Sequence, residues 1–250
     1  MGIEFPTIET PSGIRVAVIA ATPEPERLVW LAQHQDVTDH MTIEDRVPSD
    51  PGAAVVKTLL QRSHFGPFEH PSITFNIGGV SRSLMAQITR HRVGISFDVQ
   101  SLRYTRLDEI GDTDEELAEA FAYPPYLHQD EPVRVVERRR SPWQIEEPQK
   151  VRAELTAAYR QVLGLYRQLL AAGLPAEDAR LILPLGTRIN MVMSVNARTL
   201  MHILDMRLPP NAQWEIRELC GALLDLAEIW MPATFRWYRE NRAGKHKLAP

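Results

Sequence analysis

The chain has 250 residues, of which 44% are hydrophobic and 24% are charged, enough to bury one sizeable core, so we expect a single domain over residues 1–250. A formal net charge of −4 argues against a general affinity for DNA or RNA, and we expect no nucleic-acid partner. The single cysteine, Cys220, excludes a disulfide framework and a cysteine-rich zinc site, so we expect no metal and a cytoplasmic location. No apolar stretch approaches the roughly 20 residues that span a bilayer, so we expect no membrane contact.

The first predicted elements are a helix over residues 51–63 and a strand over residues 72–77. The helix is indicated by aliphatic residues at helical spacing after a proline, and Gly66-Pro67 is expected to stop it. In the strand, polar and apolar residues alternate, as they do in a half-buried strand. We expect Gly78-Gly79 to end it.

A second helix is expected to start near Ser81 and to carry charged residues toward the interior at its end. Leu84 and Ile88 share one side of this helix with His91 and Arg92, so His91 and Arg92 should point inward. Fixed positive charge near a core needs an anionic partner, and the planar donor fork of arginine matches phosphate oxygens. We therefore expect a nucleotide or a phosphate-bearing cofactor at this position.

Two further positions could hold phosphate. In an extended segment Ser101 and Arg103 would point to the same face, although a solvated arginine at a strand edge fits the pattern as well. Arg180 lies among aliphatic residues just before Pro184, where its stem could also pack while its head stays in water. For Arg90 to Arg92 alone, the alternative is a favourable contact with the carbonyl end of a helix.

Residues 124–148 contain five prolines and the charged run 137–140 without sustained periodicity, which indicates a surface insertion. A long helix follows, and Gly173 is expected to stop it. Its apolar stripe consists of Leu155, Tyr159, Val162, Tyr166, Leu169 and Leu170.

Residues 189–195 alternate as a strand, and Asn196 can cap the helix that follows. In that helix Arg207 shares the apolar side with Leu200 and Ile203. An unpaired charge on this side would cost several kcal/mol, so Arg207 must have a partner or line a pocket.

A last amphipathic helix covers residues 216–230, with further aromatic residues near the C-terminus. It places Cys220 beside Leu219 and Leu223. We interpret Cys220 as a packed core thiol without a catalytic role.

Several spaced motifs together resemble the flavin-dependent thymidylate synthases. The signature of that family is Arg-His-Arg, a spacer and then Ser-x-Arg, which this chain matches with Arg90-His91-Arg92 and Ser101-x-Arg103. The further matches, in order, are Phe68-Glu69-His70, Ala179-Arg180-x-x-Leu183-Pro184, Asn196-x-Arg198, Met206-Arg207 and Ala212-Gln213-x-Glu215-Ile216. The resemblance covers roughly residues 50–220.

The resemblance implies conversion of dUMP to dTMP, with methylenetetrahydrofolate as one-carbon donor and a hydride from FAD that NADPH has reduced. It also implies an α+β fold, in which a small, mostly antiparallel sheet packs with several helices. The family forms a homotetramer with active sites shared between subunits. The flavin carries the redox chemistry, and the protein mainly orients and polarises.

The resemblance also assigns the site residues. Contacts to FAD fall on His70, Ser72, Arg90, His91, Arg92, Asn196, Arg198, His202 and Asn211. Contacts to dUMP fall on Gln87, Ser101, Arg103, Arg180 and Arg207. Arg207 is also the catalytic residue, because it matches the arginine that faces the uracil ring, and a guanidinium that cannot lose its proton can stabilise the negative charge that makes uracil C5 nucleophilic.

The chain departs from the family pattern at three places. The spacer from Val93 to Gln100 has eight residues, one more than the common form, which a bulge can absorb. Asn211 stands where the family often has a histidine, and an amide can hydrogen-bond a flavin carbonyl but carries no charge. Residues 124–148 have no assigned counterpart.

Two other functions fit the same residues. One is a related pyrimidine-nucleotide transferase, for example a hydroxymethyltransferase, that uses the same pocket without the complete reductive cycle. The other is an arginine-rich RNA-binding protein whose clusters touch backbone phosphates, in which case binding should weaken steeply with salt.

Overall fold

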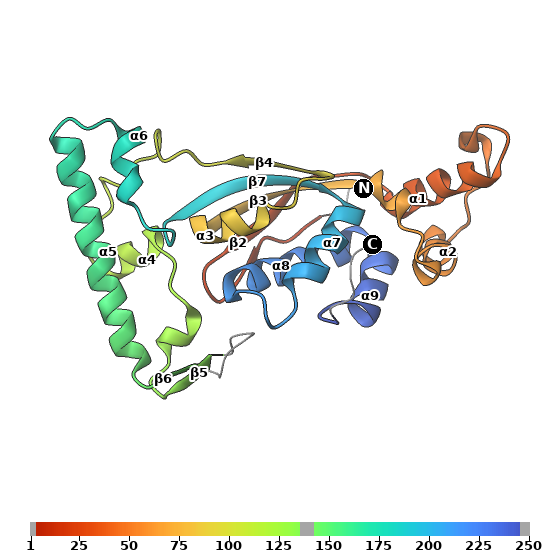
Figure 1. The fold of residues 1–250 in the computed structure, drawn as a ribbon. Helices are drawn as coiled ribbons and strands as arrows, with labels where there is room; N and C mark the ends of the chain where they lie inside the picture. The colour runs from red at the N-terminus through yellow and green to blue at the C-terminus, as the bar shows by residue number, and fades with distance from the viewer. Residues whose placement is uncertain (1–3, 136–142, 246–250) are drawn as a thin grey trace.

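A five-stranded antiparallel sheet forms the centre of the protein in the computed structural model, which describes residues 4–135 and 143–245. The strand order is β1-β2-β3-β7-β4 (Figure 1). The strands are β1 (Ile8–Glu9), β2 (Arg15–Ala21), β3 (Ser72–Ser81), β7 (Arg188–Asn196) and β4 (Ile95–Val99). The pairing of β3 with β7 brings together segments that are far apart in the sequence.

One face of this sheet is buried, as the alternation of side chains along each strand requires. In β3 the side chains of Ile73, Phe75 and Ile77 are fully buried, whereas Ser72 and Asn76 are exposed. The buried face packs against α3 (Arg82–Ile88), α7 (Ala197–Arg207) and α8 (Trp214–Trp230) (Figure 1). Of the candidate site residues, α3 carries Gln87 and α7 carries Arg198, His202 and Arg207, and the others lie outside these three helices.

The remaining elements lie at the two ends of the sheet (Figure 1). At one end α4 (Asp114–Ala120), α5 (Pro148–Ala171) and α6 (Ala176–Ala179) surround a second apolar cluster. At the other end lie α1 (Pro25–His34), α2 (Pro51–Thr58) and α9 (Pro232–Asn241). Short 3-10 segments cover Gln35–Val37, Thr42–Glu44, Leu60–Arg62, Gly66–Glu69, Pro125–His128 and Arg180–Ile182. Within residues 4–135 and 143–245, no helix has the length and apolar character that a bilayer crossing requires.

Several predicted features are confirmed. The antiparallel sheet and its packed helices form the expected mixed fold of helices and strands. β7 ends at Asn196, whose side-chain oxygen accepts a hydrogen bond from the Thr199 amide at 2.8 Å and caps α7. The long helix α5 ends at Ala171, and Gly173 adopts a φ of 91° just after it.

The prediction that Gly78-Gly79 ends the strand is wrong, because β3 continues to Ser81. The pairing with β7 shifts register here and Gly79 has a φ of 76°, so the two glycines form a bulge within the strand. A Cβ atom at Gly79 would come within 2.9 Å of the Gly13 carbonyl oxygen. The glycines therefore allow a close approach of the loop before β2.

Two other segments differ from the expectation or extend beyond it. The helix predicted over residues 51–63 ends at Thr58 and continues as a 3-10 turn, after which Ser63 adopts a left-handed φ of 59°. The expected insertion at 124–148 contains an antiparallel pair, β5 (Val133–Val135) with β6 (Trp143–Ile145). The charged run 137–140 lies outside the described residues.

Candidate functional site

A cavity of about 530 Å³ lies where the turn after α3 meets the start of α7. It is lined by most of the residues that were assigned to the flavin, namely Arg90, His91, Arg92, Asn196, Arg198 and His202. Three assigned residues, His70, Ser72 and Asn211, have exposed side chains and do not line it. The single chain therefore brings together one part of the predicted flavin set.

The walls of this cavity are held together by contacts between the turn and the start of α7. The backbone N–H of Asn196 donates to the Gly94 carbonyl oxygen at 2.9 Å, and the Thr199 hydroxyl donates to the Val93 carbonyl oxygen at 2.8 Å. Gly94 has a φ of 66°, and a Cβ atom there would collide with the side chains of Asn196 and Thr199. Glycine at this position thus permits the contact that closes one side of the cavity.

The cavity has an excess of positive charge. Arg198 is paired with Glu69, with 2.6 Å between Nη1 and Oε1. Arg90 and Arg92 form no ion pair with any described residue. Two unpaired guanidinium groups beside a hollow favour an anionic ligand.

The expectation that both His91 and Arg92 point inward is correct only for His91. α3 ends at Ile88, so the helical phase does not extend to Arg92. Instead the His91 amide donates to the Ile88 carbonyl at 3.1 Å in a turn, His91 is 8% exposed and Arg92 is exposed. Arg92 can still reach the cavity, but from its rim.

Arg207 at the end of α7 is half-buried and has the partners that its position requires. Its Nε donates to His91 Nε2 at 3.2 Å, and its Nη2 donates to the backbone carbonyl oxygen of Gln87 at 3.1 Å. Burial lowers the pKa of Arg207, and burial together with the charges of Arg207, His202 and Arg90 lowers the pKa of His91 to about 4. A guanidinium keeps its proton in spite of this shift, so Arg207 is a cation held by two uncharged acceptors.

The residues assigned to the phosphate of dUMP form a second group. The Arg103 Nε lies 4.0 Å from a carboxylate oxygen of Glu177, and the Arg180 Nε donates to the Glu177 carbonyl at 3.1 Å. The expectation of an extended segment at Ser101 and Arg103 is wrong, because β4 ends at Val99 and a turn follows. In this turn the backbone N–H of Arg103 lies 3.4 Å from the Ser101 hydroxyl oxygen, so the two residues are close in space.

Arg82 is a further member of this group that sequence reasoning missed. It is the first residue of α3, is partly buried and has a pKa lowered by burial and by the charge of Arg180. Among the described residues it has no carboxylate partner within ion-pair distance. The signal in the sequence was a cation at the start of a predicted helix, where the helix dipole disfavours positive charge.

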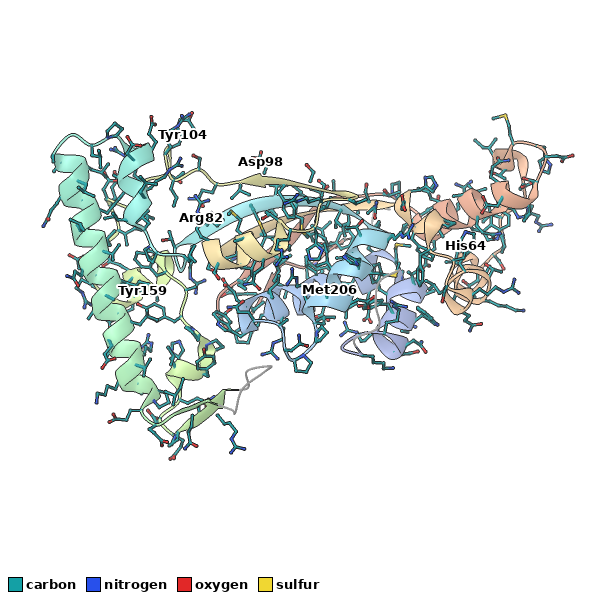
Figure 2. The ribbon with its side chains drawn as sticks, viewed as in Figure 1. His64, Arg82, Asp98, Tyr104, Tyr159 and Met206 are labelled. Carbon is teal, nitrogen blue, oxygen red and sulfur yellow. The ribbon has the colours of Figure 1, made fainter. Side chains whose placement is uncertain are left out.

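The two groups lie at opposite ends of β4. Gly94 contacts Asn196 just before the strand begins. After the strand ends, the backbone N–H of Gln100 donates to the backbone carbonyl oxygen of Asn190 at 2.9 Å. A strand of five residues advances about 16 Å. Figure 2 shows Tyr104, the neighbour of Arg103, and Met206, the neighbour of Arg207, at separate places along the sheet.

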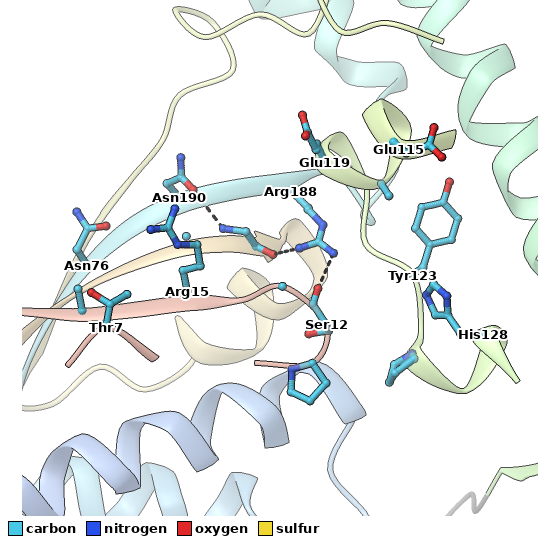
Figure 3. A pocket seen from close by; sticks show the side chains of 17 residues that line it. Thr7, Ser12, Arg15, Asn76, Glu115, Glu119, Tyr123, His128, Arg188 and Asn190 are labelled. Carbon is cyan, nitrogen blue, oxygen red and sulfur yellow. Dashed lines mark hydrogen bonds between the residues drawn. The ribbon is translucent and has the colours of Figure 1, made fainter. Parts of the chain in front are cut away.

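A larger cavity of about 750 Å³ lies elsewhere, between the sheet and α4 (Figure 3). None of the predicted site residues lines it. Arg188, a partly buried cation at this cavity, donates to the carbonyl oxygens of Ser12 and Gly79, each at 2.8 Å (Figure 3), and to that of Phe121 at 3.2 Å. Arg188 therefore fastens three segments of backbone together, and the smaller cavity is the better candidate for the active site.

Cys220 lies in the core, as predicted. It is fully buried in α8, and burial raises the pKa of its thiol to about 12. A thiol in this state is not a nucleophile at neutral pH. The geometry gives Cys220 a packing role.

Comparison with known proteins gives consistent results. The family model described as "Thymidylate synthase complementing protein" matches residues 17–233. A flavin-dependent thymidylate synthase of Halobacterium salinarum is 39% identical over 251 residues, covering 95% of this chain and 100% of that protein. The one of Haloarcula marismortui is 40% identical over 248 residues, covering 94% of this chain and 99% of that protein.

One solved structure supports the fold. It is a UMP/dUMP methylase, PolB, from Streptomyces cacaoi, bound with 5-Br dUMP. The two chains superpose with a TM-score of 0.77 at 24% identity, over 97% of this chain and 100% of the other. The likeness therefore extends over the whole architecture, including the sheet and both of its ends.

Proposed function

This chain belongs to the family of flavin-dependent thymidylate synthases, and we propose that it converts dUMP to dTMP with FAD as its flavin, methylenetetrahydrofolate as one-carbon donor and NADPH as reductant. When bound, the flavin supplies the hydride that reduces the one-carbon unit. The residues of the chain bind and orient the reactants and stabilise charge on the pyrimidine.

The observation that carries this proposal is the state of Arg207. It is half-buried, permanently charged and held by a histidine nitrogen and a backbone carbonyl, with no carboxylate among the described residues to neutralise it. Uracil C5 becomes a carbon nucleophile only when negative charge on the ring is stabilised. A fixed, unneutralised guanidinium between the flavin cavity and α3 is suited to that role.

The cavity at the start of α7 fits an anionic cofactor. Arg90 and Arg92 lie at it without carboxylate partners, and Asn196 and His202 add hydrogen-bonding groups. A flavin dinucleotide carries a pyrophosphate, which two guanidinium groups can bind. We assign the cofactor contacts to Arg90, His91, Arg92, Asn196, Arg198 and His202.

The substrate phosphate is proposed to bind at the other end of α3. Arg103, Arg180 and Arg82 supply the positive charge there, with Ser101 as a hydroxyl donor. Arg82 and Gln87 lie about 8 Å apart along the axis of α3. A nucleoside monophosphate can extend along the helix between its phosphate end and Arg207.

We propose that the active form is a homotetramer with shared sites. His70, Ser72 and Asn211 are exposed and lie outside the cavity of their own chain. If they contact flavin, as the family resemblance implies, copies of these residues from another subunit can complete the site. Mass measurement of the flavin-bound protein in solution tests this: a tetramer supports the arrangement, and an active monomer contradicts it.

Product analysis tests the proposed reaction. Purified protein with FAD, dUMP, methylenetetrahydrofolate and NADPH should yield a product with the mass of dTMP, and omission of NADPH should abolish it. A hydroxymethylated nucleotide in the complete mixture would favour the related transferase. Absence of any pyrimidine product, in a protein that has bound flavin, would contradict the proposal.

A further inference from the structure

Among the described residues, Arg207 has hydrogen-bond partners for two of its N–H groups. A guanidinium has five N–H donors, of which Nε is used by His91 and one on Nη2 by the Gln87 carbonyl, so three remain. Both acceptors are uncharged. The contacts therefore orient Arg207 without cancelling its charge.

The hydrogen bond from Arg207 also fixes the state of the His91 ring. A guanidinium has no lone pair to offer, so His91 Nε2 must be the acceptor and its proton must sit on Nδ1. Protonation of Nε2 would place two cations in contact and break the bond.

The surroundings of His91 keep it in that state. Arg90 and Arg92 flank it in its own turn, and His202 on α7 meets its ring edge to face, with 5.3 Å between the ring centroids. Arg198 on α7 also lines the cavity, and the carboxylate of Glu69 forms an ion pair with it, with 2.6 Å between Arg198 Nη1 and Glu69 Oε1. The groups that face His91 are thus mainly cationic, which agrees with the lowered pKa of His91.

We propose that His91 is the positioning residue for Arg207: its unprotonated Nε2, on a ring that also lines the flavin cavity, holds the guanidinium so that the free N–H groups face the pyrimidine. This inference rests on the proposed function. It makes one ring part of both the cofactor wall and the support of the uracil-facing arginine.

Two variants separate the acceptor from the ring. His91→Phe keeps an aromatic ring against His202 but removes the acceptor, whereas His91→Gln offers a carbonyl acceptor and cannot become a cation. With saturating flavin, the kcat for dTMP formation should fall roughly tenfold or more in His91→Phe, the loss expected for one charge-assisted hydrogen bond. His91→Gln should retain most of the kcat.

A double-mutant cycle decides whether His91 acts through Arg207. If it does, His91→Phe combined with Arg207→Ala should be no slower than Arg207→Ala alone, because the bond is already lost. If the two losses multiply, or if His91→Phe lowers only the melting temperature, the positioning role is overturned. A kcat of His91→Gln as low as that of His91→Phe would also count against it.

His202→Phe is the matched control, since it makes the same exchange in the neighbouring ring of the same cavity. No hydrogen bond joins His202 to Arg207 among the described residues. In the double variant His202→Phe with Arg207→Ala, the fold reduction in kcat should equal the product of the two single reductions. A wild-type protein that forms no dTMP would overturn the proposed function and this inference with it, whereas an active wild type with a multiplicative His91–Arg207 cycle overturns the inference alone.

Discussion

The two ends of β4 hold their arginines in different ways. At the end proposed for the flavin, His91 is only 8% exposed and Arg207 is half-buried, and hydrogen bonds of 3.1 and 3.2 Å fix the guanidinium. At the end proposed for the substrate phosphate, the side chains of Arg103 and Glu177 are 47% and 53% exposed and lie 4.0 Å apart. At the first end, hydrogen bonds fix the direction of the guanidinium. At the second end, the arginine is held by an exposed charge pair, whose attraction water and salt can screen.

Because of this difference, substitution of an arginine should have different effects at the two ends. Loss of a fixed, partly buried cation should lower the rate of the chemical step, because that cation acts on charge that develops during the reaction. Loss of an exposed arginine should weaken substrate or cofactor binding and should depend on salt.

Arg207→Ala should have the largest effect. We expect the kcat for dTMP formation to fall by roughly two to three orders of magnitude, since a fixed donor to developing charge is lost. Flavin retention and reduction of the flavin by NADPH should stay close to wild type. Steady-state kinetics with Arg160→Ala as control, an exposed arginine paired with Asp114, checks this; normal turnover in Arg207→Ala would remove the proposed role.

The pH dependence of stability should report on the buried end. The pKa of His91 in the folded protein is about 4, below its ordinary value of 6.5, so the unfolded chain binds the proton more readily. The His91 contribution to the free energy of unfolding is therefore complete above pH 6.5 and is lost as the pH falls toward 4, by up to about 3 kcal/mol. Urea titrations of wild type and His91→Gln at neutral and acidic pH measure it, and equal losses in both proteins would contradict the account.

Arg180→Ala should act mainly on binding of dUMP. We expect the KM for dUMP to rise by the equivalent of about 2–3 kcal/mol at low salt, with kcat largely kept. The difference from wild type should shrink as salt is added. Arg82→Ala should change the KM in the same direction, and an unchanged KM in both variants would place the phosphate elsewhere.

Arg92→Ala tests the rim of the flavin cavity. Flavin affinity should fall by about 1.5–2 kcal/mol, because one exposed charge-assisted contact is lost. Equilibrium dialysis of the purified variant against FAD measures it, with Arg62→Ala as an exposed arginine outside the cavity. Flavin retention equal to wild type would remove Arg92 from the cofactor contacts.

Cys220→Ala should have the smallest effect. The thiol is fully buried and its pKa is raised to about 12, so we expect only a packing loss of about 1 kcal/mol and full activity. Loss of all activity in a folded, flavin-bound variant would instead indicate a covalent role for the thiol.

The sequence predicted the features that depend on local pattern. The phase of α7 placed Arg207 on the apolar side, and Asn196 was identified as its cap. The order of the motifs indicated which residues to assign to the flavin, and the structure brings six of those nine to one cavity and leaves His70, Ser72 and Asn211 outside it.

The features that the sequence did not predict depend on contacts between distant segments. The continuation of β3 past Gly79 rests on Gly13 and on the Arg188 side chain. The end of α3 at Ile88, which turns Arg92 outward, is followed by a turn that is tied to the start of α7. The nearness of Arg82 to Arg180 joins residues almost 100 positions apart, which no local periodicity can indicate.

Release of tritium from dUMP labelled at C5 tests the central claim most directly. The wild-type protein should release tritium in the complete mixture with FAD, methylenetetrahydrofolate and NADPH, and release should stop when methylenetetrahydrofolate is omitted. Arg207→Ala with bound flavin should release almost none. Tritium release at the wild-type rate from Arg207→Ala, or none from a flavin-bound wild type, would contradict the account.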